Sequence, residues 1–167
     1  MRKENILHKE EPDLIEINKR ISELYEYALY DKSNKLKIIY IGEVDSTLAD
    51  KIFNATKMKL QGYKICIDNF SILHTLNKHG NPVKEAKRGQ IAVTEQDFYY
   101  INNIVDNPDQ IIYKGKSSVG NDVLEFGKKI NNKYFVLKEV RKITSTKKEK
   151  ENKMPSKRNP QFFLFNL

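Results

Sequence analysis

The chain of 167 residues is 39% hydrophobic and 31% charged, a composition that excludes a disordered protein and suits one globular domain or one domain with an added arm. It has a formal net charge of +8 and one cysteine, so an internal disulfide is excluded. No run approaches the roughly 18 apolar residues of a membrane helix. We therefore expect a cytoplasmic protein with no membrane partner, although a toxin delivered into a target cell would look the same.

The basic charge is concentrated in the later part of the chain. Residues 1–50 contain 8 Lys and Arg against 11 Asp and Glu, whereas residues 51–167 contain 22 against 11. The positive electrostatic field of such a charge excess favours binding to polyanions. Nucleic acid is the commonest polyanion, and an acidic protein or a membrane surface is the alternative partner.

The first part of the chain has the pattern of a helix, a strand and a second helix. Apolar residues at steps of three and four predict an amphipathic helix over 13–30, which packs either on the domain's own core or on a partner helix. A β-branched run predicts a buried strand over 36–44, and helical spacing returns over 47–57. We expect residues 1–61 to form this N-terminal helical and αβα region.

A second short strand or extended segment, over 62–69, leads into a helix that carries His74 and His79. Asp68 or Asn69 is expected to cap this helix. We expect Gly80 to end it with a left-handed turn, after which Pro82 prevents continuation.

A basic loop, an extended piece and another helix are expected next. The loop covers 83–90 and residues 91–94 are extended, after which Thr94 should cap a helix that runs to about Asp106.

The remaining sequence has the strand and turn pattern of an antiparallel sheet. Strand patterns over 110–116, 122–130 and 133–140 are separated by short turns, which predicts a meander. A basic stretch follows over 141–158, and the last residues, QFFLFNL, suit an edge strand or a packed tail. Helices followed by a small antiparallel sheet predict an α+β fold, with 62–167 as its core and a basic C-terminal segment.

The residue types favour proton-transfer chemistry without a metal. His74 and His79 are five residues apart, about 140° around a helix, so they do not share one face as a zinc pair would. The chain also lacks a phosphate-binding glycine loop, and we expect neither metal nor cofactor. Cys66 lies between isoleucines and is expected to be a buried thiol rather than a nucleophile.

RNA cleavage by the 2′-hydroxyl needs a base, an acid and groups that bind the phosphate. His79 faces the negative end of its helix dipole, which favours the protonated ring and suits an acid or a phosphate binder. His74 would suit the base if it is exposed, and both residues could instead be structural. Cations and hydroxyls that could contact the phosphate are Lys78, Lys84, Lys87, Arg88, Lys138, Arg141, Lys142, Thr144 and Thr146.

The order of three segments resembles a known superfamily. The segments ILHTLNKHG, KRGQIAVTEQDFYYINNIVDNPDQIIY and LEFGKKINNKYFVLKEVR are similar to those of phage-associated members of the barnase, EndoU, colicin-type and RelE-like nucleases. The resemblance implies a helix-plus-antiparallel-sheet fold and metal-independent RNase activity. It implies His74 and His79 as catalytic residues, with Arg141 and either Thr144 or Thr146 contacting the phosphate.

Three functions remain open at this point. The leading one is an RNA endonuclease, a toxin or phage effector, that acts on tRNA or another RNA and leaves a cyclic phosphate. A toxin of this charge would have an acidic antitoxin or immunity protein as a partner. The alternatives are a non-catalytic nucleic-acid-binding or phage-structural accessory domain, and a protein-interaction module.

Overall fold

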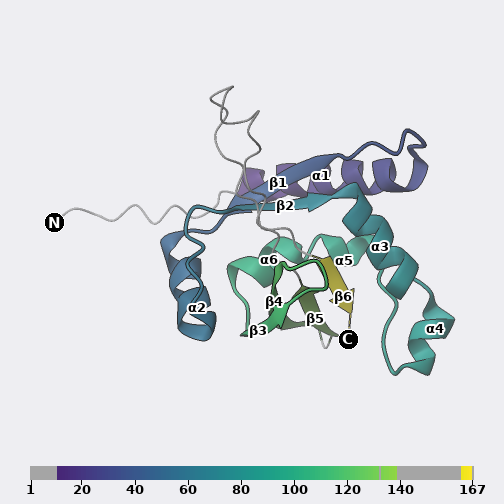
Figure 1. Cartoon of the computed structure of the whole chain (residues 1–167). Helices are drawn as coiled ribbons and strands as arrows, with labels where there is room; N and C mark the ends of the chain where they lie inside the picture. The colour runs from purple at the N-terminus through teal and green to yellow at the C-terminus, as the bar shows by residue number, and fades with distance from the viewer. Residues whose placement is uncertain (1–10, 132, 139–162, 167) are drawn as a thin grey trace.

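A computed structural model describes residues 11–131, 133–138 and 163–166 and has an α+β arrangement (Figure 1). In chain order the elements are α1 (Glu11–Tyr30), β1 (Ile38–Glu43), α2 (Ser46–Thr56), β2 (Lys64–Asp68), α3 (Asn69–His79), α4 (Pro82–Lys87), α5 (Glu95–Phe98), α6 (Ile101–Asp106), β3 (Gln110–Lys116), β4 (Asp122–Ile130), β5 (Lys133–Lys138) and β6 (Phe163–Asn166). The predicted fold class is confirmed.

The strands form two separate antiparallel sheets. β1 pairs with β2, and β3, β4, β5 and β6 follow one another in a four-stranded sheet. The predicted meander is therefore confirmed. Within the described residues β6 pairs with β5 at the edge of this sheet, so residues 163–166 form an edge strand. The basic stretch 141–158 lies outside the described residues.

Helix α1 packs on the core of the domain through the stripe that its sequence predicts. Ile17, Ile21, Leu24 and Ala28 are buried in the main hydrophobic cluster, whereas Leu14 at the start of the stripe is exposed. The cluster also includes residues from β2, α2, α6 and β4, so one core joins α1 to both sheets. This decides between the two alternatives for α1 in favour of packing on the chain itself. The predicted domain boundary at residue 61 stays a prediction.

Two local predictions were wrong. The first part of the loop expected over 83–90 belongs to the short helix α4 (Pro82–Lys87), because Pro82 suits a first helical position and Asn81 Oδ1 accepts the Lys84 N–H at 3.0 Å. The helix expected from Thr94 to Asp106 is two helices, α5 and α6. At the junction the N–H groups of Tyr99 and Tyr100 donate to carbonyls three residues back, which tightens the turn.

The predicted cap at Thr94 is confirmed, and of the two candidates for the cap of α3 the structure has Asp68 rather than Asn69. Thr94 and Asp97 form a capping box, and Asp68 caps α3.

No helix in the described ranges is both long and apolar enough to cross a membrane.

Candidate active site

Helix α3 holds both candidate histidines and is fixed firmly at its start. The buried carboxylate of Asp68, the last residue of β2, accepts the Ser71 N–H at 2.6 Å and the Ser71 hydroxyl at 2.8 Å. The buried side chain of Asn69 accepts the Lys37 N–H at 2.8 Å and donates to the Lys35 carbonyl at 3.1 Å. These bonds tie the start of α3 to the segment that enters β1. The helix then packs against α1 and β6.

Gly80 ends α3, but for a different reason from the one predicted. Its φ is −89°, so the expected left-handed turn is wrong. Its N–H donates to the Leu76 carbonyl at 2.8 Å, and a Cβ on Gly80 would lie 2.4 Å from that same oxygen. Glycine is therefore required here because the backbone approaches too closely for any side chain.

His79, the last residue of α3, meets a buried carboxylate from α4. Its Nδ1 lies 3.2 Å from Oε2 of Glu85, and 17% of its side chain is exposed whereas Glu85 is completely buried. The His79 carbonyl accepts the Val93 N–H at 2.8 Å, which fixes the backbone on the other side. The contact with Glu85 therefore holds a ring that is mostly buried but still reaches the surface.

Glu85 also binds a cation through its other oxygen. Arg88 Nη1 donates to Glu85 Oε1 at 3.0 Å, and 57% of the Arg88 side chain is exposed. One buried carboxylate therefore joins a half-buried imidazole to an exposed guanidinium. Glu85 was not predicted from the sequence because a loop was expected there, and an i, i+3 pair with Arg88 has no meaning in a loop. The signal that could have found it is a single acid in the basic run PVKEAKR.

His74 does not share this arrangement. It lies on the exposed side of α3, five residues before His79 and about 140° around the helix axis. The structure therefore places the two imidazoles on different sides of one helix.

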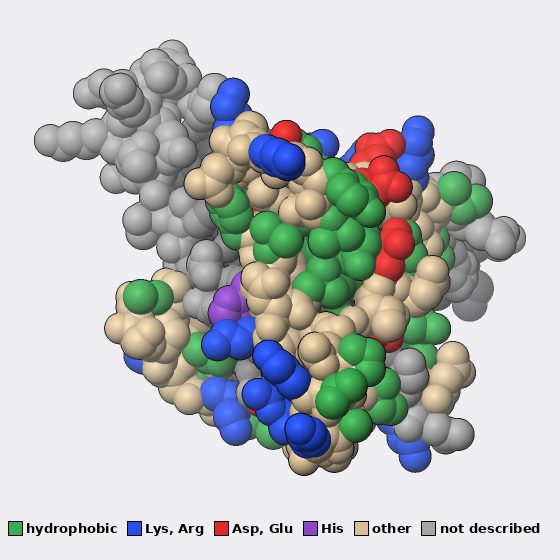
Figure 2. Space-filling model, turned by 90° about the vertical axis from the view of Figure 1, so that its right-hand side faces the viewer, with side chains coloured by type: hydrophobic (Ala, Val, Ile, Leu, Met, Phe, Trp, Pro, Cys, Tyr) green, Lys and Arg blue, Asp and Glu red, His purple; other side chains and the backbone are tan. Residues whose placement is uncertain are grey.

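Exposed cations surround the turn between α3 and α4. Figure 2 views this end of the molecule, where Lys and Arg side chains gather beside a histidine. The predicted contact residues that are exposed in these two helices and in the turn after them are Lys78, Lys84, Lys87 and Arg88.

The other predicted contacts lie at or beyond the end of β5. Lys138 is the last residue of that strand, where its backbone pairs with Glu125 and Phe163. Arg141, Lys142, Thr144 and Thr146 lie outside the described residues.

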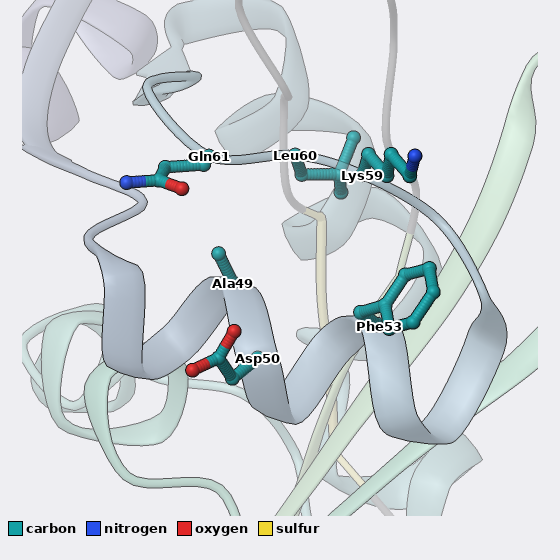
Figure 3. Close-up of a pocket in the computed structure, with 6 residues that line it drawn as sticks. All are labelled: Ala49, Asp50, Phe53, Lys59, Leu60 and Gln61. Carbon is teal, nitrogen blue, oxygen red and sulfur yellow. The ribbon is translucent and has the colours of Figure 1, made fainter.

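Two hollows lie beside α2, away from these histidines. One, of about 220 Å³, lies between α2 and the segment before β2. Figure 3 shows Asp50 and Gln61 toward one end of this hollow and Phe53 and Lys59 toward the other. The second, of about 470 Å³, lies between α2 and the start of β3. In Figure 1 α2 and α3 lie at opposite edges of the four-stranded sheet, α2 beside β3 and α3 beside β6. Neither hollow is lined by a predicted site residue.

Cys66 is a buried thiol outside any disulfide, as its sequence context predicts. Burial, with a smaller effect of the Asp68 carboxylate, raises the pKa of Cys66 to about 12. The thiol is therefore protonated near neutral pH and is no nucleophile. Within the described part of the chain, no three His, Cys, Asp or Glu side chains are grouped as metal ligands.

Comparison with known proteins identifies a family. The sequence model of a family described as phage-Barnase-EndoU-ColicinE5/D-RelE like nuclease3 matches residues 42–150. The matched range contains α2 to β5 in full and therefore includes His74, His79 and Glu85. No curated protein and no solved structure matches the chain significantly.

Proposed function

Because the chain belongs to the family of phage-Barnase-EndoU-ColicinE5/D-RelE like nucleases, we propose that it is a metal-independent RNA endonuclease. The observation that carries this proposal is the position of His79, whose ring is held by a buried carboxylate at the edge of an exposed basic surface. Such a ring can exchange a proton with a substrate whose phosphate the neighbouring cations bind.

The reaction is a transesterification within the RNA. The 2′ oxygen loses its proton to a base and attacks the adjacent phosphorus, the bond from phosphorus to the 5′ oxygen breaks, and an acid protonates that oxygen. The products are a 2′,3′-cyclic phosphate and a 5′-hydroxyl, with no water consumed. His79 and His74 supply the two proton transfers.

Cations around α3 and α4 would bind the phosphate as its charge grows. Lys78, Lys84 and Lys87 act as point charges, and Arg88 can donate N–H groups to the phosphate in addition to the one that binds Glu85. We assign the same role to the remaining predicted contacts, Lys138, Arg141, Lys142, Thr144 and Thr146.

The biological setting that suits this chemistry is a phage effector or a toxin. An excess of 22 Lys and Arg over 11 Asp and Glu in residues 51–167 favours RNA, either tRNA or another, as the substrate. The same charge favours an acidic antitoxin or immunity protein as an inhibitor, because complementary charge speeds association.

Incubation of total RNA with the full chain in EDTA tests this function. We expect discrete fragments with 2′,3′-cyclic phosphate ends, and loss of cleavage in His79→Ala and in His74→Ala. The matched control is Asn77→Ala, which changes an exposed residue between the two histidines on the same helix. Salt-sensitive RNA binding without cleavage would instead support a non-catalytic nucleic-acid-binding domain.

A further inference from the structure

We propose that Glu85 is a positioning residue that fixes the tautomer of His79 and, through its other oxygen, the direction of Arg88. This inference rests on the proposed nuclease function for its catalytic consequence, but its structural content can be measured without any substrate.

The complete burial of Glu85 points to a specific role for its carboxylate. A carboxylate is rarely buried completely unless its oxygens are paired, because removing it from water is costly. Here Oε2 meets His79 at 3.2 Å and Oε1 meets Arg88 at 3.0 Å, so each oxygen has its own partner. Both partners reach the surface, which places Glu85 directly behind the groups proposed to meet the substrate.

The same contact constrains the proton on the imidazole. An ionised carboxylate only accepts hydrogen bonds, so the contact with Oε2 requires the proton of a neutral His79 to sit on Nδ1. That tautomer makes Nε2 the atom that exchanges a proton with the substrate. A carboxylate that holds a histidine in this way is a general means of fixing ring orientation.

The backbone fixes both ends of the contact. The Glu85 carbonyl accepts the N–H groups of Arg88 and Gln90, both at 2.9 Å. Gly89, at φ +71°, provides the left-handed turn that brings Gln90 back to this carbonyl. His79 is held in turn by the Val93 N–H, at 2.8 Å from its carbonyl. The carboxylate and the ring thus face each other from two anchored segments.

The direct test is the tautomer of His79, read from two-bond ¹⁵N–¹H correlations of the full chain across a pH titration. The chain has three histidines, and His79→Gln assigns the signal. We expect the neutral ring of the wild type to carry its proton on Nδ1. A neutral ring with the proton on Nε2 would overturn the proposal, and the tautomer itself is read on the wild type.

The variant Glu85→Gln connects the tautomer to catalysis. We expect a mixture of tautomers and a fall in kcat of at least about 10- to 100-fold, the loss seen when a metal-bound histidine loses the partner that orients it. The matched control Glu23→Gln changes an exposed carboxylate of α1 and should leave both readouts unchanged. A folded Glu85→Gln with wild-type tautomer and kcat would contradict the proposal. If the wild type shows the Nδ1–H tautomer but cleaves no RNA, the proposed function fails while the positioning role of Glu85 stands.

Discussion

The imidazole of His79 and the carboxylate of Glu85 lie 3.2 Å apart, although Glu85 is completely buried and His79 ends a different helix. The contact crosses the turn between α3 and α4, whose geometry depends on Gly80 and Asn81. The arrangement of the site is therefore sensitive to changes in this turn that touch neither side chain.

Two glycines near this turn should respond differently to substitution. In Gly80→Ala the new Cβ meets the Leu76 carbonyl oxygen at 2.4 Å, and we expect a loss of about 1–3 kcal/mol in the free energy of unfolding. Gly89→Ala meets nothing within 4 Å and should cost about 1 kcal/mol through its φ of +71° alone.

Asparagine separates these two causes, since it tolerates the left-handed region better than alanine does. Urea unfolding should show Gly89→Asn to be more stable than Gly89→Ala, with no such gain for Gly80→Asn over Gly80→Ala. If asparagine were more stable than alanine by the same amount at both positions, Gly80 would also be required for its backbone conformation.

Helix α1 lies outside the matched range 42–150 but supports the helix that carries the histidines. Leu24 is completely buried in the core, so Leu24→Ala should lower the free energy of unfolding by about 2–5 kcal/mol. Ile15→Ala on the same helix changes a side chain that is 68% exposed and should cost less than about 0.5 kcal/mol. Similarly small losses in the free energy of unfolding for both variants would show that α1 is not part of the folded core.

The buried thiol of Cys66 should be inert in the folded protein. Its pKa of about 12 keeps it protonated, and only the thiolate attacks a disulfide reagent. Labelling by an aromatic disulfide at pH 8 should therefore be slow and should speed up as urea unfolds the chain. Rapid labelling in the absence of urea would contradict the burial of this side chain.

The same raised pKa makes stability depend on pH in a defined window. Between the ordinary thiol value near 9 and the folded value near 12, the unfolded chain loses this proton and the folded chain keeps it. Stability should therefore fall as the pH rises through that window. Cys66→Ala should show a smaller fall between pH 8 and 10 than the wild type, whereas an equal fall would assign the loss to other groups.

The basic residues of α4 should determine how salt affects RNA binding. Replacing both Lys84 and Lys87 with alanine should reduce the slope of log K against log salt by about 0.7 for each phosphate of single-stranded RNA that is no longer neutralised. The control replaces the exposed Lys19 and Lys51, on α1 and α2, and changes net charge equally. Equal slopes for the two variants would mean that RNA responds to total charge rather than to this surface.

Much of the fold could be predicted because its signals are local. The buried stripe of α1, the strand patterns and the caps at Asp68 and Thr94 each depend on residues within a few positions of one another. Helix α4 was missed because one and a half turns give almost no periodicity.

The site was less predictable because its main contact is tertiary. Helical periodicity says nothing about residues six apart across a turn, as His79 and Glu85 are, and Glu85 looks like one solvated charge among several. Gly80 shows a related limit. A glycine after a helix serves either a left-handed turn or a close backbone contact, and the residue type alone does not distinguish them.

The proposed mechanism requires that this chain cleave RNA through the 2′-hydroxyl without a metal, using His79. The most direct measurement compares two RNAs in EDTA that differ only by a 2′-deoxy nucleotide on the 5′ side of the mapped cleavage site. We expect the wild type to cut the all-ribose strand alone and His79→Ala to cut neither. Equal cutting of both strands, or full activity of His79→Ala, would contradict this mechanism.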